Sequence, residues 1–252
     1  MRLGCQSITF RNATPPWPLP AALDAIAAAG FEGVELTANT LDLLTPERLA
    51  ALVGERGLQV VALHLNSGNF DPEAKPRNPV DMDALRECLR ICGVPFVLTS
   101  GTGGRRPDDL ALLLGAAGRE LATLGATLCY HNHGPELEQD ARWLAEFCAA
   151  GDPAHVGLAF DLGWAARVGA EPAVFIRRFA ERIRYVHIKD TAGDIWTELG
   201  RGQVDLPAAL GALQACALPW WVAEQDRCDG DPGESVRVNG AYLRDWRRTA
   251  AT

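Results

Sequence analysis

Short apolar runs alternate with longer Ala- and Leu-rich segments along the whole chain. A short apolar run bounded by glycine, proline or polar residues is typical of a buried strand, and apolar positions three and four apart are typical of a helix. The runs predict eight strands, at residues 3–10, 33–36, 57–65, 94–99, 126–130, 156–160, 183–188 and 220–223. The segments between them predict helices at residues 19–29, 46–56, 80–92, 107–124, 140–150, after Pro172, 206–216 and 234–247.

This alternation predicts the fold class. Strands that are each followed by a helix form a parallel sheet with the helices outside, and eight such pairs are typical of a (β/α)8 TIM barrel of the α/β class. A barrel of this kind uses about 250 residues, so we interpret residues 1–252 as one domain. A doubly wound open sheet shows the same alternation, but Gly101-Thr-Gly-Gly resembles its phosphate fingerprint only superficially.

Metal-capable side chains end three successive predicted strands. Asp161, His187 and Glu224 each close an apolar run, and the carboxyl ends of barrel strands meet at one mouth. Two carboxylates and an imidazole that converge there are typical of a divalent-metal site. Lys189 alternates with His187 onto the same side of an extended chain. We also predict at this mouth a set of polar residues from the other strands: Glu35, His64, Asn66, His131, Asn132 and His133.

Each of these residues has a structural alternative. Asp161 alone is as typical of a helix N-cap or a turn as of a metal ligand. His64 alone is more typical of a hydrogen-bonded, half-buried histidine. Glu224 and Glu35 interrupt apolar strands, so each needs a cation or strong donors, and pairing with Arg201 is an alternative to a metal. The combination indicates a metal site more strongly than any single residue does.

Composition and charge narrow the class of partner. The formal net charge is −8, with acidic and basic residues interspersed, so we predict a small-molecule partner and no nucleic acid. The seven cysteines include no Cys-x-x-Cys pair, which is typical of reduced thiols in a cytoplasmic protein. No apolar run approaches the roughly 18 residues of a membrane span, and no export signal is recognised. Trp17, Phe70 and Trp196 in predicted loops indicate either pocket lids or contacts of a homo-oligomer.

Seven short motifs in order resemble one known superfamily. They are Phe31-Glu-Gly-Val-Glu-Leu, Gly57-Leu-Gln-Val-Val-Ala-Leu-His, Tyr130-His-Asn-His, Phe160-Asp-Leu-Gly-Trp, Val186-His-Ile-Lys-Asp, Leu199-Gly-Arg-Gly and Val222-Ala-Glu-Gln-Asp. Together they resemble the sugar phosphate isomerase/epimerase superfamily. Its members are xylose isomerase-like TIM barrels that include ketose 3-epimerases, inosose dehydratase and 3-dehydroshikimate dehydratase. The resemblance implies a metal site made by a strand-five carboxylate followed by Asp161, His187 and Glu224.

The chain departs from that pattern at strand five, where many relatives place Glu. His131 stands in this position, so we predict it as the fourth ligand, with His133 or Glu136 as alternatives. The change removes one of the two carboxylates that act as paired acid and base in the epimerases. Trp164 stands where several relatives have histidine, and we predict that it forms an apolar wall over a sugar ring.

The resemblance also implies a reaction. A divalent cation makes the carbon next to a ketone acidic because it stabilises the enediolate. We predict that Glu224 takes that proton, and that Lys189, His64 or His133 returns one to carbon or to a departing hydroxyl. The remaining predicted substrate contacts are Glu35, His64, His133, Glu136, Trp164 and Arg201. Mixed oxygen and imidazole ligands favour Mn²⁺, with Co²⁺, Zn²⁺ and Mg²⁺ as alternatives.

The fold and these residues suggest four candidate functions. The leading hypothesis is a metal-dependent carbohydrate isomerase or epimerase that acts on a carbohydrate or polyol-derived ketone. The alternative is a lyase, a dehydratase of an inosose or keto-sugar at the same metal site, which the His131 substitution favours. An apurinic-site endonuclease of this fold needs more histidines than the chain has, and a basic face that its net charge of −8 does not favour. A metal-free sugar-binding barrel predicts ligand binding that is indifferent to a chelator.

Overall fold

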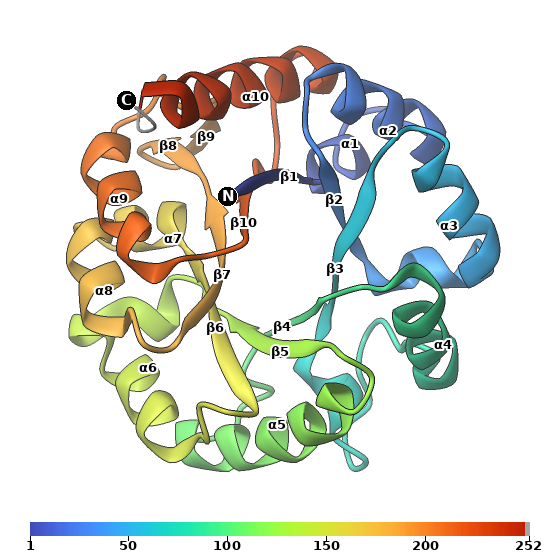
Figure 1. Ribbon diagram of the computed structural model, residues 1–252. Helices are drawn as coiled ribbons and strands as arrows, with labels where there is room; N and C mark the ends of the chain where they lie inside the picture. Colours follow the sequence, from blue (N-terminus) through green and yellow to red (C-terminus); the bar gives the residue numbers. More distant parts are fainter. Residues whose placement is uncertain (250–252) are drawn as a thin grey trace.

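Eight parallel strands close into a barrel within residues 1–249, the part of the chain that the computed structural model describes (Figure 1). Around the ring the order is β1, β10, β7, β6, β5, β4, β3 and β2, and β1 pairs with β2 to close it. The strands are β1 (Arg2–Gln6), β2 (Gly33–Thr37), β3 (Gln59–Asn66), β4 (Phe96–Ser100), β5 (Thr127–His131), β6 (Val156–Asp161), β7 (Ile183–Ile188) and β10 (Trp220–Ala223). The prediction of a (β/α)8 TIM barrel is confirmed.

Helices form an outer ring around these strands (Figure 1). They are α1 (Ile8–Arg11), α2 (Leu19–Ala28), α3 (Pro46–Gly54), α4 (Met82–Cys92), α5 (Pro107–Ala122), α6 (Glu138–Ala150), α7 (Leu162–Arg167), α8 (Pro172–Phe179), α9 (Leu206–Leu213) and α10 (Pro232–Thr249). Short 3₁₀ turns are η1 (Ala38–Asp42), η2 (Ser67–Phe70), η3 (Pro135–Leu137) and η4 (Gln214–Cys216). An antiparallel hairpin of β8 (Asp190–Ala192) and β9 (Ile195–Thr197) follows β7.

The apolar strands are buried on both sides, which explains their continuous hydrophobic runs. A large core cluster packs the outer side of the barrel against the helices. A smaller cluster lies inside the barrel below the mouth, with Phe96 of β4 against Tyr185 of β7 at a ring distance of 5.1 Å. The barrel interior is therefore a packed floor, and polar side chains collect above it at the carboxyl ends of the strands.

Most predicted elements are found within a few residues of their expected ends. β7 and β10 have the predicted bounds, and the Thr45 side chain caps α3 by accepting from the Arg48 N–H at 3.4 Å. The prediction of a first strand that reaches Phe10 is wrong. The strand ends at Gln6, whose side-chain oxygen accepts from the Ile8 N–H and starts α1. The chain thereby turns off the barrel and packs Phe10 against Trp17.

Two elements beside the mouth were not predicted. α7 follows β6 directly, because the Asp161 carboxylate accepts from the Trp164 N–H at 2.9 Å and caps it. The β8–β9 hairpin occupies the loop after β7. The regular part of α6 begins late, since Gln139, Asp140 and Ala141 have left-handed backbone angles.

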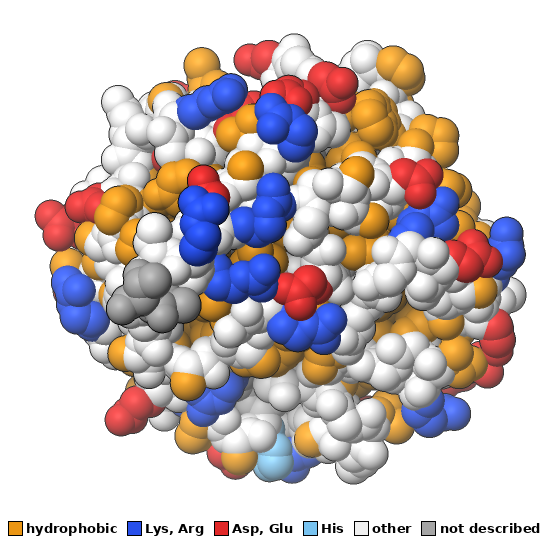
Figure 2. Space-filling view, turned by 45° about the horizontal axis from the view of Figure 1, so that its top comes forward, with side chains coloured by type: hydrophobic (Ala, Val, Ile, Leu, Met, Phe, Trp, Pro, Cys, Tyr) orange, Lys and Arg blue, Asp and Glu red, His pale blue; other side chains and the backbone are white. Residues whose placement is uncertain are grey.

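The surface carries charges of both signs. On the face shown in Figure 2, basic and acidic side chains are intermixed with apolar ones. Ion pairs connect Arg2 and Arg247 to Glu32 at 3.3 and 2.7 Å, and such exposed pairs stabilise a protein only slightly. Across the described residues, none of the helices combines the length and the apolar character that a membrane span requires.

Candidate metal centre

Four side chains meet at the barrel mouth. His131 ends β5, Asp161 ends β6, His187 lies near the end of β7, and Glu224 follows β10. One ligand atom from each lies within 4.8 Å of the others, and all four residues are buried. The strand register explains this meeting, because Asp161 is level with His187, and His187 is level with Val222, two residues before Glu224. The structure thus brings together the four residues predicted as metal ligands.

Unsatisfied polar atoms of this group fit a divalent cation. Within the described chain, His131 Nδ1, His187 Nδ1 and Glu224 Oε2 are buried without a hydrogen-bond partner. His187 Nδ1 and Glu224 Oε2 lie 2.7 Å apart as an ion pair, at an angle unfavourable for a hydrogen bond. Buried polar atoms rarely lack a partner, and such exceptions often mark an ion site. Two imidazoles and two carboxylates are a donor set that transition metals and zinc accept.

The protonation states of two members suit metal ligation. Burial, with help from the neighbouring imidazoles, lowers the pKa of His131 to about 3, although Asp161 opposes the shift. Burial would raise the pKa of Asp161, but the Lys189 ammonium and His131 lower it to about 2. Near neutral pH His131 therefore has a free lone pair and Asp161 is ionised, which are the forms that bind metal.

Glu35 supports His187 from below. Glu35 has no exposed surface, and its Oε2 lies 2.7 Å from His187 Nε2 and accepts from the Tyr185 hydroxyl at 2.8 Å. Its Oε1 accepts from Gln6 Nε2 at 2.8 Å and contacts His64 Nδ1 at 3.3 Å. A carboxylate behind a histidine fixes the ring so that the opposite nitrogen faces a metal. Glu35 is therefore placed to support His187, and its contact with a substrate stays a prediction.

Lys189 is buried among three carboxylates. Its Nζ lies 2.9 Å from Asp161 Oδ2, 3.2 Å from Glu224 Oε2 and 2.9 Å from Asp226 Oδ2. Burial would lower the pKa of Lys189, but Asp161, Glu224 and Asp226 outweigh it and raise that pKa. The side chain is fully buried and stays charged. Asp226 was not predicted as a site residue, although it stands two positions after Glu224.

The alternatives for the strand-five ligand have other contacts. Glu136 is buried and accepts from the Tyr130 hydroxyl at 2.8 Å and from the His133 N–H at 3.0 Å, so it holds the loop after β5. The half-buried His133 ring lies 4.9 Å from His131 and 5.3 Å from Trp164. The structure brings His131 into the four-residue group, and His133 and Glu136 lie beside it.

His64 stands next to the centre. Its ring is half-buried, 5.1 Å from the His131 ring and 6.3 Å from the His187 ring. Its two nitrogens contact Glu35 at 3.3 Å and Ser100 Oγ at 3.1 Å. His64 therefore supplies a further imidazole at the mouth that does not belong to the four-residue group.

An aromatic corner covers Lys189. Trp164 of α7 and Trp196 of β9 meet edge to face with ring centroids 5.1 Å apart. Lys189 Nζ lies 4.7 Å from the Trp196 centroid and 6.0 Å from the Trp164 centroid, distances typical of cation–π contacts. Gly163 permits this packing, because a Cβ there would lie 2.7 Å from Trp196 and 2.9 Å from Lys189. The predicted wall at Trp164 thus has a partner from the unpredicted hairpin.

Asp190 organises the loop that follows the hairpin. Its buried carboxylate accepts four backbone N–H bonds, from Thr191, Gly200, Gly202 and Val204, at 2.8 to 3.1 Å. The structure does not bring Arg201 of this loop to the other predicted residues. Arg201 is exposed and its Nη1 lies 3.3 Å from Glu198. Sequence reasoning missed Asp190, and the feature that could have identified it is its place directly after Lys189, at the end of an apolar strand.

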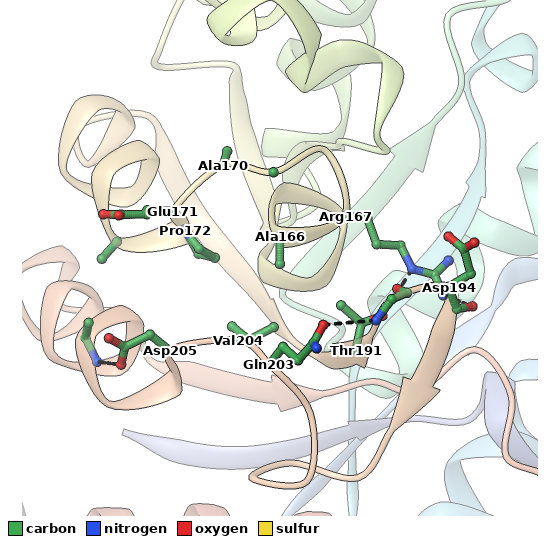
Figure 3. A pocket seen from close by; sticks show the side chains of 14 residues that line it. Ala166, Arg167, Ala170, Glu171, Pro172, Thr191, Asp194, Gln203, Val204 and Asp205 are labelled. Carbon is green, nitrogen blue, oxygen red and sulfur yellow. Dashed lines mark hydrogen bonds between the residues drawn. The ribbon is translucent and has the colours of Figure 1, made fainter.

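A hollow of about 440 Å³ lies beside the hairpin, outside the four-residue group (Figure 3). Arg167 and Asp194 line it on the hairpin side, and Glu171 and Pro172 line it near α8 (Figure 3). The Arg167 guanidinium also lies 3.4 Å from the Trp196 centroid and donates to the Asp194 carbonyl. Arg167 therefore forms part of the wall between this hollow and the aromatic corner.

Comparisons with known proteins agree with this architecture. The chain is 34% identical over 234 residues to an inosose dehydratase of Geobacillus kaustophilus, covering 83% of this chain and 75% of the relative. It is 29% identical over 285 residues to the rhizopine catabolism protein MocC of Rhizobium meliloti, covering 92% and 84%. The solved structure of the IolI protein with a bound zinc atom has a TM-score of 0.71 at 17% identity and covers 97% of each chain. The model of the xylose isomerase-like TIM barrel family matches residues 23–245, so the chain belongs to that family.

Proposed function

We propose that this chain is a metal-dependent lyase that removes water from a cyclic polyhydroxylated ketone of the inosose class. The observation that carries the proposal is the pairing of Glu224 with Lys189, in which a buried carboxylate oxygen lies 3.2 Å from an ammonium. Dehydration needs one group that takes a proton from carbon and another that gives a proton to the departing hydroxyl. The similarity to proteins named inosose dehydratase supports this substrate class.

His131, Asp161, His187 and Glu224 would hold the cation. The cation would supply Lewis-acid stabilisation of the negative charge that develops on the carbonyl oxygen. We favour Mn²⁺ for this donor set, with Zn²⁺, Co²⁺ and Mg²⁺ as alternatives, and the zinc in the structurally similar IolI protein supports a divalent metal.

Glu224 takes the proton from the carbon next to the carbonyl. Burial would raise the pKa of Glu224, but His187 and Lys189 lower it, so the carboxylate is ionised and able to accept. Lys189 then donates a proton to the leaving hydroxyl, and the electron pair of the broken carbon–hydrogen bond forms the new double bond. Trp164 and Trp196 pack against the apolar face of the ring and keep water from the reacting carbon.

The acid–base groups favour dehydration over epimerisation. Epimerisation by two carboxylates needs a second free carboxylate, and both oxygens of Glu35 are occupied by Gln6, Tyr185 and two histidines. An isomerase or epimerase is the second candidate, because His64 and His133 are half-buried imidazoles that suit proton return to carbon.

A solvent-isotope experiment tests these two reactions. The Mn²⁺-loaded protein is incubated in D₂O with inososes and with ketoses, and products are analysed by mass spectrometry and ultraviolet absorption. Dehydration gives an unsaturated product that is lighter by one water. Isomerisation or epimerisation loses no water and gives a sugar in which deuterium replaces a carbon-bound hydrogen. Glu224→Gln should abolish either reaction, and Glu234→Gln on the exposed start of α10 serves as the matched control.

The metal itself is tested separately. We expect about one divalent ion per chain in the wild type and loss of that ion in Glu224→Gln and His131→Ala, measured by elemental analysis. Sugar binding without metal, and unchanged by a chelator, would instead identify a metal-free sugar-binding barrel. The cytoplasmic location and the homo-oligomeric state stay predictions.

A further inference from the structure

The Lys189 ammonium and a bound cation would use the same oxygens. Asp161 Oδ2 lies 2.9 Å from Lys189 Nζ, 3.2 Å from His131 Nε2 and 4.0 Å from His187 Nδ1. Glu224 Oε2 lies 3.2 Å from the same ammonium and 2.7 Å from His187 Nδ1. Each oxygen thus faces both the lysine and an imidazole of the candidate centre. A cation held there would weaken both contacts of Lys189, because it would attract the carboxylate oxygens and repel the ammonium.

Asp226 is the remaining carboxylate partner of Lys189 among the described residues. Its Oδ2 accepts from Nζ at 2.9 Å, and its side chain lies outside the four-residue group. The Asp226 side chain is 30% exposed, whereas the Lys189 side chain is fully buried. The Lys189–Asp226 contact therefore runs from the buried lysine toward solvent.

Contacts from α1 and α10 fix the backbone that carries Asp226. Thr9 donates to the Gln225 carbonyl, and Asn12 Nδ2 donates to the Asp226 carbonyl at 2.7 Å. The buried Gln225 side chain accepts from Asn239 Nδ2 at 3.2 Å. A carboxylate on a segment with this many fixed groups keeps its place whether or not a cation occupies the centre.

We propose that Asp226 is a positioning residue that holds the Lys189 ammonium at the mouth, so that lysine and metal occupy the centre together. Without Asp226, the ammonium depends on Asp161 and Glu224 alone and competes with the cation for their oxygens. This inference rests on the proposed function, because it assumes the metal site and the role of Lys189 as proton donor.

A double-mutant cycle on metal affinity tests the proposal without any substrate. Metal-stripped wild type, Asp226→Asn, Lys189→Met and the double variant are titrated with Mn²⁺ by calorimetry. We expect Asp226→Asn to weaken Mn²⁺ binding by about tenfold or more, as loss of a supporting group near a metal does. In the Lys189→Met background the same change should weaken binding by less than about threefold, because the competing ammonium is gone.

Control variants separate this effect from a general loss of charge. Asp229→Asn removes an exposed negative charge from the same loop and should leave Mn²⁺ affinity unchanged. Asp226→Glu keeps the charge and should restore affinity to within about threefold of the wild type. Circular dichroism shows whether Lys189→Met folds. If it does not, the comparison of Asp226→Asn with Asp226→Glu still tests the proposal.

Two results would overturn the proposal. One is an equal loss of affinity on Asp226→Asn in the presence and absence of Lys189. The other is an affinity of Asp226→Glu as weak as that of Asp226→Asn. Failure of the wild type to bind Mn²⁺, Zn²⁺ or Co²⁺ would instead refute the metal centre of the proposed function.

Discussion

Replacement of Glu35 by Gln tests whether a buried carboxylate organises the centre from below. The substitution keeps the shape but removes the charge and one of two accepting oxygens. Those oxygens meet Gln6 at 2.8 Å, Tyr185 at 2.8 Å, His187 at 2.7 Å and His64 at 3.3 Å. The best orientation of the new amide keeps its oxygen on Tyr185 and His187. The amide nitrogen then faces the Gln6 donor, and that hydrogen bond is lost.

The expected loss follows from these contacts. A hydrogen bond to a charged group contributes about 1.5–3 kcal/mol, and the bonds that remain to the neutral amide weaken, so we expect the free energy of unfolding to fall by about 3 kcal/mol. For a chain of this size that corresponds to a decrease of about 6–12 °C in the unfolding temperature. Metal affinity should fall by about 10- to 100-fold, because the His187 ring loses its anionic support.

Thermal unfolding of the metal-free protein and calorimetric Mn²⁺ titration measure the two effects. Glu32→Gln is the matched control, because Glu32 precedes the same strand but is partly exposed and pairs with Arg2 and Arg247. This control should change the unfolding temperature only slightly. Wild-type metal affinity in Glu35→Gln would refute the role of Glu35 in orienting His187, whatever its effect on stability.

Three further predictions concern the aromatic corner, the loop held by Asp190 and the pH dependence of stability. Gly163→Ala should shift the Trp196 fluorescence and reduce kcat/KM for the proposed dehydration by about 100-fold, because the new Cβ displaces the aromatic corner. As the control, Gly211 has no neighbour within 4 Å in the described chain, so Gly211→Ala should stabilise α9 by about 0.5–1 kcal/mol. Asp190→Asn turns an amide nitrogen toward the N–H groups either of Gly200 and Gly202 or of Thr191 and Val204, so hydrogen exchange of residues 199–204 should accelerate, and unchanged exchange would contradict this. The pKa of Glu35 is about 2 when folded, against an ordinary 4.5, because His187 and His64 outweigh the opposing effect of burial. Unfolded chains therefore take up this proton first, and urea titrations should show a loss of about 3 kcal/mol as the pH falls from 4.5 to 2.

The barrel and the residues that meet at its mouth were accessible from the sequence because strand ends carry both signals. An apolar run marks the strand, and the first polar residue after it marks the mouth, which identified Asp161, His187 and Glu224 without any structure. The choice of His131 at strand five rested on resemblance, and the register of β5 with β6 explains why it reaches the other three. These signals are local along the chain, so a sequence contains them directly.

The contacts missed by sequence reasoning depend on geometry across the mouth. The hairpin that carries Trp196 is only two three-residue strands, too short for a periodic pattern. Asp226 lies in a loop, and side chains of Thr9, Asn12 and Asn239, far away in the sequence, hold the backbone and the Gln225 side chain beside it. The segment of α1 itself was predicted as strand, because Ile8 and Phe10 alternate with polar residues as in a strand, and four residues are too few to show a helical period. Long-range partners of this kind leave no local pattern.

The charge balance of the centre connects the metal to the kind of substrate. Four carboxylates face two cationic side chains, which leaves two negative charges in excess; the groups are Glu35, Asp161, Glu224, Asp226, Lys189 and His187. Burial and the carboxylates of Glu224 and Glu35 act in opposite directions on the pKa of His187, and the carboxylates win and raise it. If His187 gave up its proton to ligate a divalent cation, one negative charge would remain. A site with that residual charge repels a phosphorylated ligand and accepts a neutral ketone, which favours an uncharged polyol-derived substrate.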